Sequence, residues 1–125
     1  MEFYRHFTGT TYTSGVQQLA EKKSAYWIID AISSHVVANS EFKKRCSTDP
    51  MFEDMQIWIL KKKQDGAKLI AVADTVREEL NAPTCEQEIE FTDFEFGEDE
   101  EIKFYCARNY DGDKPFYTIM RPREY

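Results

Sequence analysis

The stretch MQIWILKKKQDGAKLIAVA, residues 55–73, decides the fold. Residues 55–60 are apolar on both faces, which is typical of a strand in the middle of a sheet. Asp65 and Gly66 form a strong hairpin signal, and the apolar residues 69–73 follow it as a second strand. The stretch therefore predicts two antiparallel strands, the first of them central.

Three more strands are predicted after this hairpin. They cover roughly residues 84–91, 101–107 and 116–121, where apolar and polar side chains recur at the spacing of a strand. Asp111 and Gly112 lie between the last two of them, in a loop that suits a second hairpin. From residue 55 onward the sequence indicates strands.

The part of the chain before residue 55 follows the helical period instead. Ser14 and Gln17 fit a capping box at the start of a first helix. Lys22 and Lys23 close that helix at its C-terminal end, where the helix dipole favours cations. A first helix of about ten residues is therefore expected here.

A second helix is expected from about residue 24 to the high thirties. Asn39 and Ser40 can then cap a further helical turn, which Asp49 and Pro50 interrupt. The side chains on the buried face of the second helix recur at the spacing i, i+3, i+4 and i+7: Ala25, Ile28, Ile29, Ile32 and Val36.

These elements predict a single α+β domain over residues 1–125. The N-terminal helices are expected to pack on one face of an antiparallel meander sheet of about four to five strands. A chain of 125 residues, 42% of them hydrophobic, is long enough to bury a core of its own.

Composition sets the expected compartment and excludes several classes of partner. The three cysteines are an odd number without a C-x-x-C pair, which favours reduced thiols in a cytoplasm. No apolar run approaches the roughly 20 residues that span a bilayer, and residues 1–6 lack the apolar core of a signal peptide. A pI near 4.9 argues against direct binding to nucleic acid.

The negative charge is concentrated in residues 86–101, called the acidic segment below. Nine of the chain's 23 carboxylates lie in this segment, which contains no Lys or Arg. On a strand, Glu88 and Glu90 would face away from Ile89, and a row of carboxylates every 6.7 Å or so could dock on a basic groove. The candidate partner-binding carboxylates are Glu86, Glu88, Glu90, Asp93, Glu95, Glu98, Asp99, Glu100 and Glu101.

Two other interpretations of the acidic segment stay open. The glutamates can be a solvated strand face that blocks aggregation from edge to edge. The carboxylates could also hold Mg²⁺ or Ca²⁺ weakly, because their spacing specifies no geometry. No cofactor is predicted, since the phosphate- and dinucleotide-binding glycine motifs are absent from the sequence.

The face of the second helix opposite its buried stripe is a second candidate site. Trp27 and Asp30 lie on it, flanked by Tyr26 and Val37. Aromatic side chains around one carboxylate are typical of a binding hot spot. The same composition also fits a helix that packs on two sides, with Asp30 hydrogen-bonded to Ser33, Ser34 or a tyrosine hydroxyl.

Catalytic constellations are weak in this sequence. The chain has two histidines, His6 and His35, and neither lies in a metal-binding helix motif. His35 flanks the buried stripe and is expected to be a core or boundary histidine. A Cys46/His35 nucleophile pair is a remote alternative, because Cys46 lies late in its helix, where the dipole opposes a thiolate.

Several strings of residues together resemble a known family. They are FTGT at 7–10, YT-x-GV-x-x-LAE at 12–21, AYW-x-I-D at 25–30, FTDF at 91–94 and P-x-EY at 122–125. The pattern is similar to an uncharacterised family of small bacterial proteins, a domain of unknown function often carried by phages and mobile elements. The resemblance covers nearly the whole chain, and it implies an accessory protein that occupies a host protein.

These observations together predict a small acidic, non-enzymatic binding protein. Its expected partner is a host protein with a basic surface, for example in a nucleic-acid-handling or defence complex, as an anti-CRISPR protein would bind. One alternative is a small enzyme or nucleotide-binding domain that uses Tyr26, Asp30 and His35. Another is a structural homo-oligomer, such as a homodimer, paired through sheet edges or the second helix.

Overall fold

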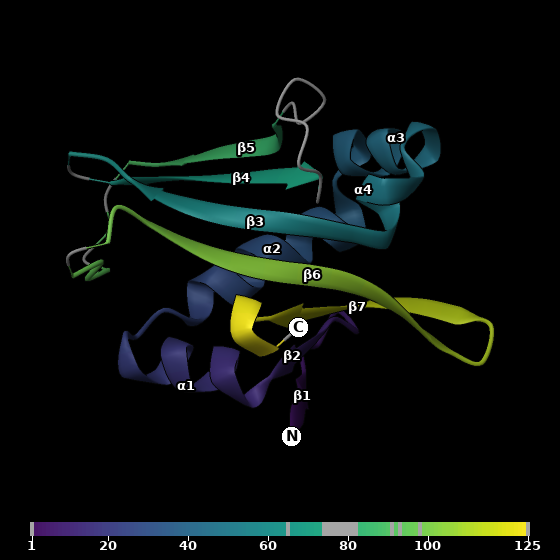
Figure 1. Ribbon diagram of the computed structural model, residues 1–125, viewed down its shortest axis with the longest axis horizontal. Coiled ribbons are helices and arrows are strands. Elements are labelled where there is room, and N and C mark those ends of the chain that lie inside the picture. The colour runs from purple at the N-terminus through teal and green to yellow at the C-terminus, as the bar shows by residue number, and fades with distance from the viewer. Residues whose placement is uncertain are drawn as a thin grey trace.

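The computed structural model describes residues 2–64, 66–73, 83–90, 92, 94–97 and 99–124 (Figure 1). Its elements follow in the order β1 (Phe3–Arg5), β2 (Thr11–Thr13), α1 (Ser14–Lys22), α2 (Tyr26–Ala38), α3 (Ser40–Thr48), α4 (Pro50–Asp54), β3 (Met55–Lys62), β4 (Ala67–Ala73), β5 (Thr84–Ile89), β6 (Glu101–Asp111), β7 (Lys114–Met120) and the 3₁₀ turn η2 (Pro122–Glu124).

The strands of the described residues form one mixed sheet of seven strands, in the order β1-β2-β7-β6-β3-β4-β5. The predicted antiparallel meander of four to five strands is therefore wrong, although the α+β class holds. β2 runs parallel to β7, with Thr11 opposite Thr118, and β1 pairs with β2 at the edge. β1 and β2 have only three residues each, too few to show the alternation on which strand prediction depends.

The connection between β5 and β6 is what breaks the meander. β5 is an edge strand beside β4, whereas β6 lies on the other side of β3. β3 pairs with β4 through Leu60 and Leu69, and with β6 through Trp58 and Phe104. The central position predicted for residues 55–60 is therefore confirmed. To reach β6, the chain that follows β5 passes the ends of β4 and β3 (Figure 1).

The helices form where the sequence predicts them, but some of their boundaries differ. Thr13, rather than Ser14, caps α1, and its hydroxyl accepts a hydrogen bond from the Val16 N–H at 3.4 Å. Pro50 follows the end of α3 and also begins α4, which Asp49 caps. A proline is tolerated at the first helical position because the N–H that it lacks would have no partner there.

The core lies between the sheet and α2, which runs behind the strands in Figure 1. The predicted stripe of α2 is buried, with Ile32 completely inaccessible. Trp58 of β3 and Phe104 of β6 belong to the same core cluster, at 0% and 1% exposure. Burying one large apolar side chain contributes about 1.5–3 kcal/mol, so this interface fixes α2 on the sheet.

Glu124 in η2 joins the end of the described chain to the start of α1. Its carboxylate accepts hydrogen bonds from the Thr13 hydroxyl at 2.7 Å, the Arg121 N–H at 2.9 Å and the Gly15 N–H at 3.2 Å. A Cβ atom at position 15 would lie 2.6 Å from this carboxylate, so the contact needs a glycine. Burial disfavours ionisation of Glu124, but these hydrogen bonds and the Arg121 charge outweigh it and lower its pKa.

Replacing the Glu124 carboxylate should cost stability at neutral pH but not in acid. Because the folded-state pKa lies below the unfolded value of about 4.3, the stabilisation is complete above that value and is lost as the pH falls through the folded-state pKa. For this partly exposed group, Glu124→Gln should lower the free energy of unfolding by about 1 kcal/mol at neutral pH. Urea unfolding from about pH 7 down to about pH 3 measures the difference, and Asp113→Asn is the control. A difference between Glu124→Gln and the unmodified protein that persists in acid would contradict this role for the charge.

Candidate functional site

The acidic segment begins on the edge of the sheet and continues across its end. Glu86 and Glu88 are exposed on β5, and Glu101 is exposed at the start of β6. Between these strands Glu90, Glu95, Asp99 and Glu100 are also exposed, whereas Asp93 and Glu98 lie outside the described residues. The seven described carboxylates therefore face solvent along one edge and the adjoining end of the sheet.

Lysines from neighbouring strands offset part of this charge. The Lys68 ammonium on β4 lies 3.3 Å from a carboxylate oxygen of Glu86 and 3.8 Å from one of Glu88. Lys63 lies 4.0 Å from Glu88, and Lys61 pairs with Glu101 in the register of β3 and β6. The acidic segment contains no Lys or Arg, but strand pairing places lysines beside Glu86 and Glu88 at its start and beside Glu101 at its end.

Four carboxylates in the middle of the acidic segment form no ion pair within the described part of the chain. The side chains of Glu90, Glu95, Asp99 and Glu100 make no ion pair or hydrogen bond with any other described residue. They lie on the connection between β5 and β6, where Lys62 and Lys63 line a pocket together with Asp99 and Glu100 without forming an ion pair with them. These four residues are called the free carboxylates below.

Two buried aromatic side chains anchor the connection that carries the free carboxylates. Phe94 and Phe96 are 6% and 7% exposed and meet edge to face, with ring centroids 4.9 Å apart. Glu95, between them, is exposed. The backbone is held as well, because the Lys62 N–H donates to the Glu100 carbonyl oxygen at 2.8 Å. Glu95 thus lies between two buried aromatic side chains, and the backbone of Glu100 is tied to β3.

The second candidate site, on α2, is tied to the N-terminal turn. Asp30 accepts a hydrogen bond from His6 Nε2 at 2.7 Å, and His6 Nδ1 lies 2.8 Å from the Thr8 hydroxyl. Trp27 is half-buried and packs against the core cluster. Asp30 therefore holds residues 6–8 against α2, and only part of the Trp27 indole faces solvent.

Tyr26, Asp30 and His35 do not converge on one site. Tyr26 accepts a hydrogen bond from Gln17 on α1 at 3.1 Å. The His35 Nε2 atom lies 2.8 Å from Gln87 on β5, and its ring stacks on Trp58 with centroids 5.5 Å apart. The three side chains therefore have partners on three different parts of the fold, and His35 occupies the boundary position expected of it.

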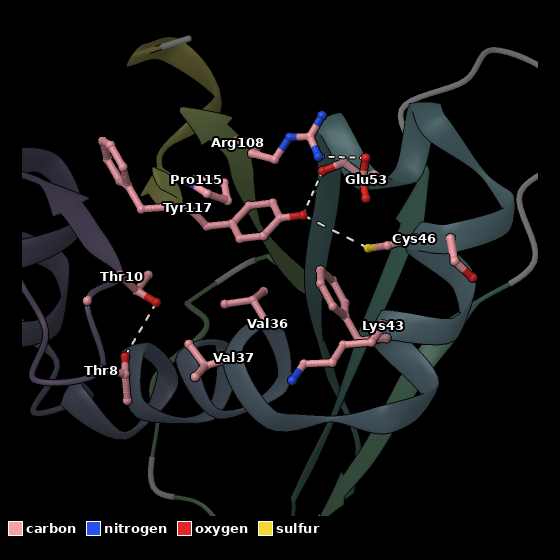
Figure 2. Close-up of a pocket in the computed structure, with 14 residues that line it drawn as sticks. Thr8, Thr10, Val36, Val37, Lys43, Cys46, Glu53, Arg108, Pro115 and Tyr117 are labelled. Atoms are coloured by element: carbon pink, nitrogen blue, oxygen red, sulfur yellow. Dashed lines mark hydrogen bonds and ion pairs between the residues drawn. The ribbon is translucent and has the colours of Figure 1, made fainter. Parts of the chain in front are cut away.

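A pocket of about 480 Å³, which the sequence did not indicate, opens between α2, α3 and β7 (Figure 2). Its lining comes from six parts of the chain: Thr8, Gly9, Thr10, Val36, Val37, Phe42, Lys43, Cys46, Ser47, Glu53, Arg108, Pro115, Phe116 and Tyr117. No local motif unites such a set, and the FTGT string at residues 7–10 is its single sequence signal.

The upper wall of the pocket in Figure 2 is a network around Arg108. The guanidinium makes ion pairs with Glu53 and, at 2.7 Å, with Asp54. The Tyr117 hydroxyl donates a hydrogen bond to the Glu53 carbonyl oxygen at 2.7 Å and lies 3.9 Å from Cys46 Sγ. The charge of Arg108 is therefore balanced by protein carboxylates.

Cys46 is not poised as a nucleophile in this wall. Burial raises the pKa of its thiol, and the hydrogen bond with Tyr117 offsets that effect only in part. Burial and the neighbouring Cys46 thiol also raise the pKa of Tyr117. The ring of His35 is bonded to Gln87 and Asn39 instead of Cys46, so the proposed Cys46/His35 pair is not assembled.

The described part of the chain lacks two kinds of feature. It contains no group of three or more His, Cys, Asp or Glu side chains that could hold a metal ion. Nor does any of its helices combine the length and apolar character needed to cross a membrane.

A protein-family model described as a family of unknown function (DUF6876) matches residues 1–125. No curated protein and no solved structure matches the chain significantly. The family match confirms one part of the resemblance seen in the sequence motifs: a domain of unknown function covers the whole chain.

Phe96→Ala should destabilise the fold and free the connection that presents the free carboxylates. Removing a buried phenylalanine side chain costs about 3 kcal/mol or more, from lost burial and the cavity left behind. Glu95→Ala, at the exposed position next to it, should change the free energy of unfolding by less than about 0.5 kcal/mol. Urea denaturation measures both variants. Equal effects of the two substitutions would mean that Phe96 does not anchor the segment.

The Cys46 thiol should react slowly with alkylating agents at neutral pH. Because its pKa is raised, the rate of reaction with iodoacetamide should still be increasing above about pH 8.5, where an unperturbed cysteine is half ionised. Peptide mapping by mass spectrometry follows Cys46 separately from the other cysteines. A rate that levels off below about pH 8 would contradict the raised pKa.

Proposed function

We propose that this chain, which belongs to the family of unknown function DUF6876, is a non-enzymatic binding protein that docks its acidic surface on a basic groove of a partner protein. The observation that supports this proposal is the set of free carboxylates on an anchored connection. The side chains of Glu90, Glu95, Asp99 and Glu100 form no ion pair with another described residue, so a partner's cations can pair with them.

The anchoring by Phe94 and Phe96 favours binding over simple solvation. A segment whose backbone is already ordered loses less conformational entropy when it binds, so more of each new contact appears as affinity. A strand face that only needs to stay soluble does not require its carboxylates on a fixed frame. Lys68 forms ion pairs with Glu86 and Glu88 and so offsets part of their negative charge. The free carboxylates are therefore the part of the acidic segment that attracts a partner's cations most strongly.

The biological setting is the finer part of the proposal. The motifs at residues 7–10, 12–21 and 25–30 are similar to those of proteins carried by phages and mobile elements. We therefore extend the proposal to an accessory factor that inhibits a host defence or nucleic-acid-handling protein, as an anti-CRISPR protein does. Its acidic surface would compete with nucleic acid for a cytoplasmic partner's basic groove, by steric and electrostatic exclusion.

Charge reversal on the connection should weaken binding without unfolding the protein. The tagged protein is used to capture partners from a bacterial lysate, and the affinity of the captured partner is then measured by interferometry. Glu95→Lys/Glu100→Lys should weaken binding by roughly tenfold or more, because two attractive contacts become repulsive. Affinity of the unmodified protein should also fall as salt rises, since exposed charges are screened.

The matched control is Asp111→Lys/Asp113→Lys, in the exposed hairpin between β6 and β7. It changes the net charge of the protein equally but lies outside the acidic segment. It should retain the affinity of the unmodified protein. If both double variants bind equally well, or if binding is insensitive to salt, the acidic surface is not the docking site.

A further inference from the structure

The pocket of Figure 2 differs in charge from the molecule as a whole. The chain carries a formal net charge of −7, yet the charged side chains lining this pocket are Lys43, Arg108 and one carboxylate, Glu53. Glu53 pairs with Arg108, which Asp54 also contacts. Lys43 is therefore the lining charge that remains unbalanced, and it favours an anion.

Lys43 is placed to meet a molecule that enters the pocket. It is exposed on α3, and its ammonium makes no ion pair or hydrogen bond with another described residue. In Figure 2 its side chain runs along the lower edge of the pocket and points towards Val37 and Thr8. An ammonium in this position can contact a carboxylate without first breaking an ion pair within the protein.

The remaining walls of the pocket are an apolar surface and a pair of threonine hydroxyl groups. Val36 and the Tyr117 ring face the centre of the pocket in Figure 2, and Val37 is 41% exposed beside them. On the opposite wall the Thr8 and Thr10 hydroxyls lie 3.4 Å apart, and His6 Nδ1 holds Thr8 at 2.8 Å. Apolar walls with a few fixed polar groups are typical of small-molecule sites.

We propose that this pocket binds a small amphipathic carboxylate of the arylalkanoate class, an activity separate from the docking of the acidic segment. The carboxylate meets the Lys43 ammonium, and the ring lies against Val36, Val37 and Tyr117. The volume of about 480 Å³ falls in the range of about 300–1,000 Å³ found for small-molecule sites. An uncharged analogue gains only the apolar contacts, and a cationic analogue is repelled by Lys43.

The test is a titration of the full chain, uniformly labelled with ¹⁵N, with 3-phenylpropionate and with its uncharged amide. In ¹H–¹⁵N spectra the carboxylate should shift the amide signals of residues 8–10, 36–37, 43–47 and 116–117. Its affinity should exceed that of the amide by roughly three- to fivefold, which corresponds to one exposed ion pair. Equal affinities, or shifts confined to other parts of the chain, would overturn the proposal.

Two variants on the same helix separate the role of Lys43 from a general effect of charge. Lys43→Gln should remove the preference for the carboxylate over the amide. Lys44→Gln changes the net charge equally, but Lys44 does not line this pocket, so the preference should remain. A third variant, Val37→Trp, should weaken both compounds by filling the pocket. If Lys44→Gln acts like Lys43→Gln, or if Val37→Trp leaves binding unchanged, the compounds do not bind as proposed.

Discussion

The position of β3 between β4 and β6 is the constraint on which the rest of the structure depends. Because β3 is paired on both sides, the chain that leaves the edge strand β5 can reach β6 only by crossing the end of the sheet. That crossing places the acidic segment beside the lysines of β3 and β4. Phe94 and Phe96 hold it against the protein, because both side chains are buried in the core cluster. The pairing of β3 with both β4 and β6 therefore determines which carboxylates form ion pairs with lysines and which do not.

Features set by nearby residues could be predicted from the sequence, and features set by distant residues could not. The stripe of α2 and the central strand at residues 55–60 follow from periodicity, which operates within one element. The strand β2 is defined by pairing with β7, and β1 by pairing with β2, and the three residues of each strand hold no usable pattern. The meander was expected because consecutive strands are usually neighbours, and here β5 and β6 are not.

Of the two candidate sites, the acidic segment could be predicted from the sequence and the pocket could not. The acidic segment was visible as a run of like charges, but its partial neutralisation by Lys63 and Lys68 depends on strand register. The pocket was invisible because its lining comes from residues far apart in the chain. The two sites have opposite electrostatic character, with free carboxylates at the end of the sheet and an unbalanced Lys43 beside α2. A single protein can thus present surfaces that select different ligands.

The parallel pairing of β2 with β7 has a consequence for biosynthesis. Thr11 and Thr118, whose hydroxyls lie 2.7 Å apart, are separated by 107 positions along the chain. During synthesis, which proceeds from the N-terminal side, β2 can pair with β7 only after residues 114–120 have been made. Contacts of such long range also slow the search for the native topology. β1 and β2 therefore join the rest of the sheet only once β7, the last strand of the described sheet in sequence order, is present.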